Sequence, residues 1–141
     1  TDRLSDLNCF WMATDPAERD GNVFAHIGER GGAFKNASSL QLYYVGYGGN
    51  HNTTTRFRRY FGKPNPPLVQ EYTESDHLLR PNHWYRIRIE TLYQHTHYYI
   101  DDELLFDYYD PRSLLRGWFG FRTTWSHCMI RRFQADCNPA D

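Results

Sequence analysis

Cationic side chains recur at alternate positions in the segment Thr53–Phe61, which reads TTTRFRRYF. Successive side chains of a β-strand point to opposite faces of a sheet. One predicted face is polar and cationic: Thr54, Arg56, Arg58 and Tyr60. The other is mixed: Thr53, Thr55, Phe57 and Arg59. Guanidinium groups bind carboxylates through paired, charge-assisted hydrogen bonds, so the first face is expected to recognise an anionic ligand. The alternative is a solvent-facing ladder of arginines paired with acidic residues on a neighbouring strand.

The segment before this strand supplies aromatic rings and amides. The rings are Tyr43, Tyr44 and Tyr47, and the intervening turn carries Asn50, His51 and Asn52. Aromatic planes stack on the apolar faces of sugars, while amides, imidazoles and guanidiniums bind hydroxyls and carboxylates. Together these residues predict a site for an acidic saccharide. Alternation places Tyr44 on one face with Leu42 and Gly46, which makes Tyr43 the outward ring unless the register shifts by one residue.

Two further segments carry candidate site residues. Trp118–His127 offers Arg122, Trp125 and His127, and alternation separates Arg122 from Trp125 unless a bulge intervenes. In the alternative reading, Trp125 belongs to the core and His127 is an ordinary loop residue. Asn8 and Trp11 lie on opposite faces of a predicted strand, so one of them is expected to face the ligand. Trp11 fits the core equally well.

These residue types favour β-elimination over hydrolysis. An arginine that neutralises a uronate carboxylate acidifies the neighbouring C5 proton, which a histidine or tyrosine then removes. The candidates for the carboxylate are Arg56, Arg58 and Arg122, and those for base and acid are His51, His127 and Tyr44. The substrate-binding candidates are Asn8, Trp11, Asn50, Asn52 and Trp125. A glycosidase needs two carboxylates across a groove, but Glu90 stands alone on its predicted strand.

The sequence predicts no metal and no cofactor. HExxH and CxxC spacings are absent, and His95 and His97 form a pair whose third ligand is not identifiable. The acidic run Asp101–Glu103 is expected to be a hairpin turn, with a structural calcium loop as the alternative.

Short apolar and alternating segments separated by turn residues predict an all-β protein. The expected strands are Leu7–Ala13, Leu40–Tyr47, Thr53–Phe61, Trp84–Leu92, Thr96–Ile100, Leu104–Tyr108, Trp118–Trp125 and Met129–Gln134. Thr14–Gly32 is expected to be a long loop, with a short turn of structure around Val23–Ile27. Such a series of strands is typical of a β-sandwich or jelly roll, here a single domain over residues 1–141.

The bulk composition excludes several function classes. Across 141 residues the net charge is −1, so no basic field indicates nucleic acid as a partner. No run of about 18 apolar residues is present, so the chain is not expected to span a membrane. Of three cysteines, Cys128 and Cys137 could pair with each other, which would leave Cys9 buried in a strand.

Three segments together resemble a concanavalin A-like jelly-roll family of unknown function that is similar to the YesU-type proteins. The segments are SDLNCFWMATDP from Ser5, YYVG from Tyr43 with NTTTR from Asn52, and RGWFGFRTTWSH from Arg116. Members of that family accompany enzymes that degrade polysaccharides containing uronic acid and rhamnose. The resemblance implies a secreted or periplasmic protein that acts on acidic polysaccharide or oligosaccharide, by lyase chemistry or as a non-catalytic binding module or accessory subunit.

The resemblance also implies β-strands before the segment Asp2–Asp6, where the printed chain has none. We therefore expect the chain to be the larger, C-terminal part of the full domain. Either a second chain or a cleaved segment supplies the missing N-terminal strands, or they are simply not part of the given chain; an incomplete jelly roll would expose sheet edges.

Overall fold

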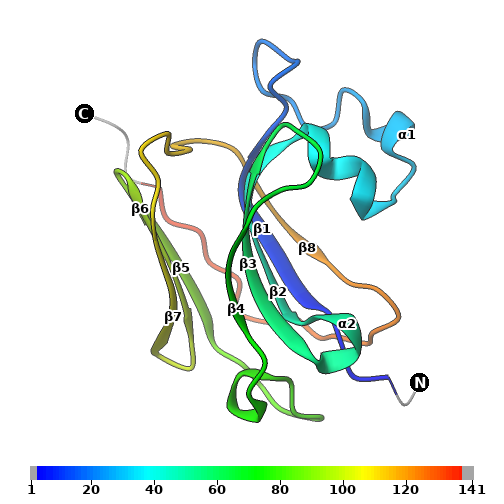
Figure 1. Ribbon diagram of the computed structural model, residues 1–141, viewed down its shortest axis with the longest axis vertical. Coiled ribbons are helices and arrows are strands. Elements are labelled where there is room, and N and C mark those ends of the chain that lie inside the picture. The colour runs from blue at the N-terminus through cyan, green and yellow to red at the C-terminus, as the bar shows by residue number, and fades with distance from the viewer. Residues whose placement is uncertain (1–2, 138–141) are drawn as a thin grey trace.

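Within residues 3–137, the part of the chain that the computed structural model describes, eight strands form two antiparallel sheets that pack face to face (Figure 1). Sheet A has the spatial order β4 (Leu68–Tyr72), β3 (Thr54–Phe61), β2 (Gln41–Gly48), β1 (Leu7–Thr14) and β8 (Trp118–Arg122). Sheet B has the order β5 (Ile87–Leu92), β6 (His95–Ile100) and β7 (Glu103–Tyr109). The predicted all-β sandwich of the jelly-roll kind is therefore confirmed.

Four short helical turns connect the strands. They are α1 (Ile27–Arg30), the 3-10 turn η1 (Phe34–Ser39), α2 (Gly49–Asn52) and the 3-10 turn η2 (Ser75–His77). We call residues 15–40, which include α1 and η1, the covering segment. It lies against the side of sheet A that faces away from sheet B, and α2 lies at the opposite end of that sheet (Figure 1).

The strand predictions were wrong in a few places. Strand β4 was not predicted, because the prolines before it indicated only a loop. The segment Met129–Gln134 was predicted as a strand but has no strand structure. It instead crosses from β8 toward sheet B, with the Phe133 ring 5.3 Å from Phe119 and the Arg131 guanidinium 3.9 Å from the ring of Trp84.

Aromatic rings from both sheets fill the space between them. Trp11 of β1 stacks on Phe57 of β3 at 6.0 Å and on Tyr98 of β6 at 6.3 Å. The Trp11 indole nitrogen donates a hydrogen bond of 3.0 Å to Thr96 Oγ1, which satisfies its one polar atom inside the core. Trp11 is therefore an inter-sheet core residue.

One end of this core contains a buried ion pair. Arg59, only 2% exposed, points between the sheets, and its Nε lies 2.7 Å from Asp110 Oδ2. The Tyr43 hydroxyl donates to the same oxygen at 2.8 Å. Burial alone would raise the pKa of Asp110, but the hydrogen bonds from Arg59 and Tyr43 outweigh it, and the pKa is lowered. Arg59 thus lies on the face that alternation predicted.

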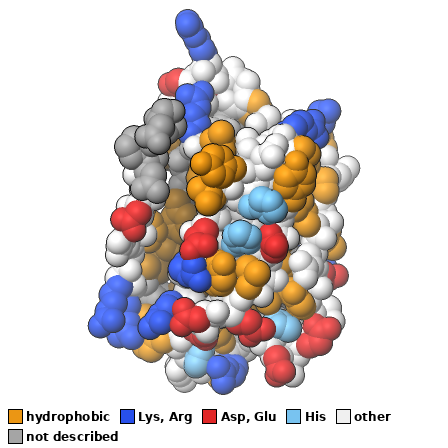
Figure 2. All heavy atoms as spheres, turned by 90° about the vertical axis from the view of Figure 1, so that its left-hand side faces the viewer, with side chains coloured by type: hydrophobic (Ala, Val, Ile, Leu, Met, Phe, Trp, Pro, Cys, Tyr) orange, Lys and Arg blue, Asp and Glu red, His pale blue; other side chains and the backbone are white. Residues whose placement is uncertain are grey.

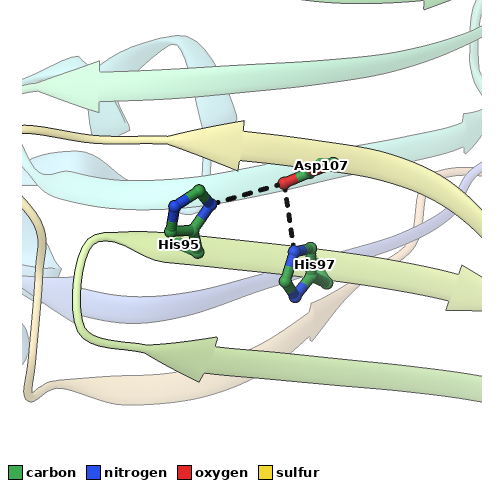
Figure 3. Close-up of side chains that lie close together, drawn as sticks. All are labelled: His95, His97 and Asp107. Carbon is green, nitrogen blue, oxygen red and sulfur yellow. Dashed lines mark ion pairs between the residues drawn. The ribbon is translucent and has the colours of Figure 1, made fainter.

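The outer face of sheet B carries a group of histidine and acidic side chains from β6 and β7. Figure 2 looks onto this face and shows histidine beside acidic side chains. His95 and His97 of β6 lie there next to Asp107 of β7 (Figure 3). The predicted turn over Asp101–Glu103 is the β6–β7 hairpin, and its acidic groups contact Arg86 and His83.

The three cysteines are free thiols: Cys9 is buried in β1, whereas Cys128 and Cys137 are exposed. Burial raises the pKa of the Cys9 thiol to about 12. No helix among residues 3–137 has the length and apolar character needed to cross a membrane.

Candidate ligand-binding face on sheet A

Strand register brings the predicted arginines together on the outer face of sheet A. Directly opposed residues of antiparallel strands point to the same face, so they form rows across the sheet. One row runs Arg56, Gly46, Asn8 and Arg122 through β3, β2, β1 and β8. The next runs Arg58, Tyr44, Phe10 and Gly120. We call this surface the tyrosine–arginine face, defined by Asn8, Tyr44, Arg56, Arg58, Tyr60 and Arg122.

Arg56 and Arg58 of β3 are partly exposed and only partly used in contacts within the protein. The Arg56 side chain is 37% exposed, and its Nε donates a hydrogen bond of 2.6 Å to Glu71 Oε1 on β4. Arg58 Nη1 donates to the carbonyl oxygen of Pro66 at 2.8 Å. A guanidinium has five N–H donors, so each of these side chains keeps donors for a further acceptor.

Tyr44 lies at the centre of the face, and Gly46 makes room for it. A Cβ atom on Gly46 would lie 3.1 Å from the Tyr44 hydroxyl oxygen and 3.4 Å from Asn8 Oδ1. Burial raises the pKa of Tyr44 to about 12, although the nearby charge of Arg122 acts to lower it. The Tyr44 hydroxyl is therefore neutral at pH 7, and the residue is only 8% exposed.

Asn8 contributes a buried amide to the same row. Its Nδ2 donates a hydrogen bond of 3.3 Å to Asp6 Oδ1, while its Oδ1 is buried without a hydrogen-bond partner among the described residues. Buried amide oxygens almost always have a partner, so this atom is a candidate acceptor for a ligand hydroxyl. Asp6 itself is fixed by Ser5 and by Arg3, whose Nη2 lies 3.2 Å from it.

The covering segment packs across the middle of the tyrosine–arginine face, where it buries the rings of Tyr44 and Tyr60. Phe34 of η1 lies 4.8 Å from the Tyr44 ring and 5.8 Å from the Tyr60 ring. The Arg122 guanidinium lies 4.3 Å from the centre of the Phe34 ring, an attractive cation–π distance. Phe34 was not among the predicted site residues, because nothing in the loop sequence indicates which ring folds back onto the sheet.

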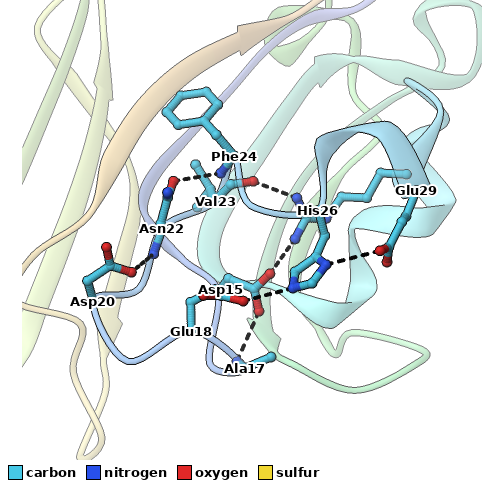
Figure 4. Close-up of polar contacts among 10 residues, drawn as sticks. Asp15, Ala17, Glu18, Asp20, Asn22, Val23, Phe24, His26 and Glu29 are labelled. Carbon is cyan, nitrogen blue, oxygen red and sulfur yellow. Dashed lines mark hydrogen bonds and ion pairs between the residues drawn. The ribbon is translucent and has the colours of Figure 1, made fainter.

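Ion pairs fix the covering segment itself (Figure 4). Arg30 Nη2 lies 2.5 Å from Asp15 Oδ2, and Arg30 Nη1 donates to the carbonyl oxygen of Val23 at 2.5 Å. His26 bridges two carboxylates, with Nε2 2.8 Å from Glu18 Oε1 and Nδ1 3.2 Å from Glu29 Oε1. Hydrogen bonds to Glu29 and Glu18 raise the pKa of His26.

The turn residues predicted to lie at the site form α2, between β2 and β3. The Asn52 side chain is used in a structural contact: its Nδ2 donates to the Leu79 carbonyl at 2.9 Å, and its Oδ1 accepts from the Leu79 amide at 2.7 Å. Asn50 and His51 are exposed, and both have positive φ. His51 lies at the end of the β2–β3 hairpin from which Arg56 projects.

The remaining predicted residues lie away from the face. Trp11 is in the inter-sheet core, as described above. Trp125 and His127 follow the end of β8 in an irregular segment, and Trp125 is 74% exposed. Tyr43, the alternative outward ring, is only 1% exposed and points toward sheet B, so the unshifted alternation assigned the wrong tyrosine to the outside.

A cavity of about 440 Å³ lies beside the buried Arg59 and shares no lining residue with the tyrosine–arginine face. It is lined by Gln41, Arg59, Phe61, Lys63, Pro64, Asn65, Pro67 and Arg112.

Fold and site together define an antiparallel β-sandwich protein whose larger sheet presents arginines and tyrosines on its outer face. The chain belongs to the family described as Domain of unknown function (DUF6250), whose model matches residues 1–133. No curated protein and no solved structure matches the chain.

Proposed function

We propose that the tyrosine–arginine face binds a uronate-containing oligosaccharide or polysaccharide. The observation that carries this proposal is the presence of three partly exposed guanidiniums, those of Arg56, Arg58 and Arg122, on one face of one sheet. Arginine recognises carboxylates in a planar, two-pronged geometry. Between these cations lie a neutral donor, the Tyr44 hydroxyl, and an acceptor without a partner, Asn8 Oδ1. Such a mixture suits a ligand that has both carboxylates and hydroxyls.

The distance between the two arginines at the ends of one row favours an extended ligand. Arg56 and Arg122 are separated by three inter-strand steps, or roughly 14 Å between their backbones at about 4.8 Å per step. A ligand that contacts both must be longer than one sugar ring. We therefore expect an oligosaccharide to bind more tightly than the free uronic acid.

A second candidate function is cleavage of the same ligand by β-elimination, favoured by the proximity of Tyr44 to Arg122. In this reaction a base removes the C5 proton, the C5–H electrons form the C4–C5 double bond, and the C4–O bond breaks. An acid then protonates the leaving oxygen. A tyrosine that is neutral at pH 7 suits the role of acid. His51, at the end of the hairpin that carries Arg56, is the proposed base.

Calorimetric titration with oligogalacturonate tests the binding proposal. Arg58→Ala and Arg122→Ala are each expected to weaken binding by about tenfold or more, since a hydrogen bond to a charged group contributes about 1.5–3 kcal/mol. The matched control is Arg86→Ala, which removes an exposed arginine near sheet B and should bind as the wild type does. Equal affinity for the carboxyl-reduced oligosaccharide, or an unchanged affinity of Arg122→Ala, would contradict the proposal.

The ultraviolet absorbance of the unsaturated product separates cleavage from binding alone. For a lyase, the signal should rise with time, and it should be lost in His51→Ala and Tyr44→Phe variants that still bind the ligand. Tight binding without any unsaturated product would leave the protein as a carbohydrate-binding module.

A further inference from the structure

Two imidazoles and one carboxylate converge on the outer face of sheet B, the opposite layer of the sandwich from the tyrosine–arginine face (Figure 3). His95 and His97 are two positions apart on β6, and buried Thr96 lies between them, so both rings point outward. Asp107 of β7 lies directly opposite His97 in the strand register. The sequence showed the histidine pair, but the third group becomes visible only when the two strands are paired.

The distances between these groups match those in a metal centre. His97 Nε2 lies 3.0 Å and His95 Nδ1 lies 3.6 Å from the same oxygen, Asp107 Oδ1, and all three ligand atoms lie within 4.8 Å of one another. Zinc binds histidine nitrogen and carboxylate oxygen at about 2.0–2.2 Å, so the atoms of a tetrahedral site stand roughly 3.4 Å apart. The observed N···O distances lie on either side of that value.

We propose that His95, His97 and Asp107 form a binding site for a divalent transition-metal ion, with Zn²⁺ as the best fit. Imidazole nitrogen with one carboxylate suits zinc and its transition-metal neighbours, whereas Ca²⁺ and Mg²⁺ prefer oxygen ligands alone. The site is accessible from solvent, since about half of the His95 and Asp107 side chains is exposed. The bound ion joins the edge strand β7 to the central strand β6.

A fourth candidate ligand lies in the same row as this site. Glu90 of β5 lies opposite His97 on the other side of β6, so the row reads Glu90, His97 and Asp107 across the sheet. The Glu90 carboxylate is paired with Arg88, so it would have to leave this ion pair to bind the metal. Removal of Glu90 is expected to weaken metal binding less than removal of His97.

Zinc titration of the metal-free protein, followed by calorimetry, tests the proposal. The titration uses the whole chain with Cys128→Ser and Cys137→Ser, because exposed thiols bind zinc by themselves. We expect saturable binding of one ion per chain and an increase in melting temperature. His97→Ala and Asp107→Ala should each weaken binding by at least about tenfold, a loss that even an outer-shell substitution can produce.

The control is His127→Ala in the same background, which removes an exposed imidazole from another part of the chain and should leave zinc affinity unchanged. The metal-free variants should melt close to their parent, since the substituted side chains project from the outer face of sheet B and not into the core. The absence of saturable zinc binding, or binding that survives the double substitution of His95 and His97 by alanine, would overturn the assignment.

Discussion

Arg59 is a charged residue inside the core, and its contacts hold a distant loop against sheet A. A guanidinium that is 2% exposed is stable only with an opposite charge and partners for its donors. Asp110 supplies the charge, and the carbonyl oxygen of Arg112 accepts from Arg59 Nη2 at 3.0 Å. The Tyr43 hydroxyl completes the network by donating to Asp110 and accepting from the Leu114 amide at 3.2 Å. The loop after β7 is thereby fixed to sheet A.

Replacing Arg59 by alanine should therefore destabilise the protein strongly. Loss of one partner leaves the other charge buried and unpaired, which costs about 3–5 kcal/mol. Urea unfolding at neutral pH measures the change. Arg86→Ala removes the exposed Arg86–Asp102 pair and should cost less than about 1 kcal/mol. Similar losses for the two variants would show that the buried pair contributes no more than a surface contact.

Side-chain alternation predicted the residue-level pattern of β3 correctly. Phe57 and Arg59 face the core, whereas Arg56 and Arg58 face outward. On β2 the same rule assigned the wrong one of the two adjacent tyrosines to the outside, because both faces of this strand are covered and both rings are buried. Only the covering segment, which has no strand-like pattern, explains why Tyr44 is buried on the outer side.

At the scale of elements, β8 is attached to sheet A through its contact with β1. Gly120 lies opposite Phe10, whose ring covers it, and a Cβ atom on Gly120 would come within 2.3 Å of that ring. The missing side chain thus lets β8 pack closely, and Arg122, two residues further, reaches the row of Asn8.

Gly120→Ala should therefore lower the unfolding free energy by about 1–3 kcal/mol, the usual cost of overpacking. Gly28→Ala is the matched control, because a Cβ atom on Gly28 in α1 would meet no atom within 4 Å. That variant should be neutral or slightly more stable, since alanine favours a helix over glycine. Denaturant melts of both variants decide the matter, and an unaffected Gly120→Ala would mean that Phe10 moves aside freely.

The covering segment should respond to pH through His26. Its raised pKa means that protonated His26 stabilises the segment; this contribution is complete below about pH 6.5 and is lost as the pH rises through the raised value. Hydrogen exchange of residues 15–40, corrected for the intrinsic pH dependence, should show stronger protection in the acidic range. His26→Ala should remove this difference, and an equal pH response in that variant would rule out His26 as its source.

The sequence predicted most strands because their apolar residues alternate. The prediction failed for two segments whose structure depends on the element they pair or pack with. β4 is largely exposed, and β3 pairs with it despite the preceding prolines. Met129–Gln134 has strand-forming residues yet lies across the side of the sandwich, where Phe133 packs on Phe119. In both cases the outcome depends on a neighbouring element that local sequence does not specify.

On the scale of the whole molecule, the buried tyrosine hydroxyls should make the folded protein less stable at alkaline pH. Burial raises the pKa of Tyr43, Tyr44, Tyr47 and Tyr60 to about 12. Each of these groups has an ordinary pKa near 10, so its stabilising contribution is complete below about pH 10 and is lost as the pH rises through 12.

We therefore expect the free energy of unfolding to fall steeply between pH 10 and 12, by roughly 2–3 kcal/mol for each phenol that ionises on unfolding. Urea melts across this range test the expectation, with tyrosinate absorbance as a parallel readout. A constant unfolding free energy together with early tyrosinate absorbance would mean that the rings ionise without unfolding.

The two sheets differ in width, since sheet A has five described strands and sheet B has three. Phe119 and Phe121 of β8 are about 40% exposed. The expectation that another chain or segment contributes further strands stays a prediction.

The buried thiol of Cys9 can serve as a chemical probe of global unfolding. Alkylating reagents attack the thiolate, and Cys9 is both enclosed between the sheets and held protonated, whereas Cys128 and Cys137 are open to reagent from the start. Labelling should therefore proceed in two phases, with two fast equivalents and one slow equivalent. The rate of the slow phase would measure how often the sandwich comes apart in the absence of denaturant.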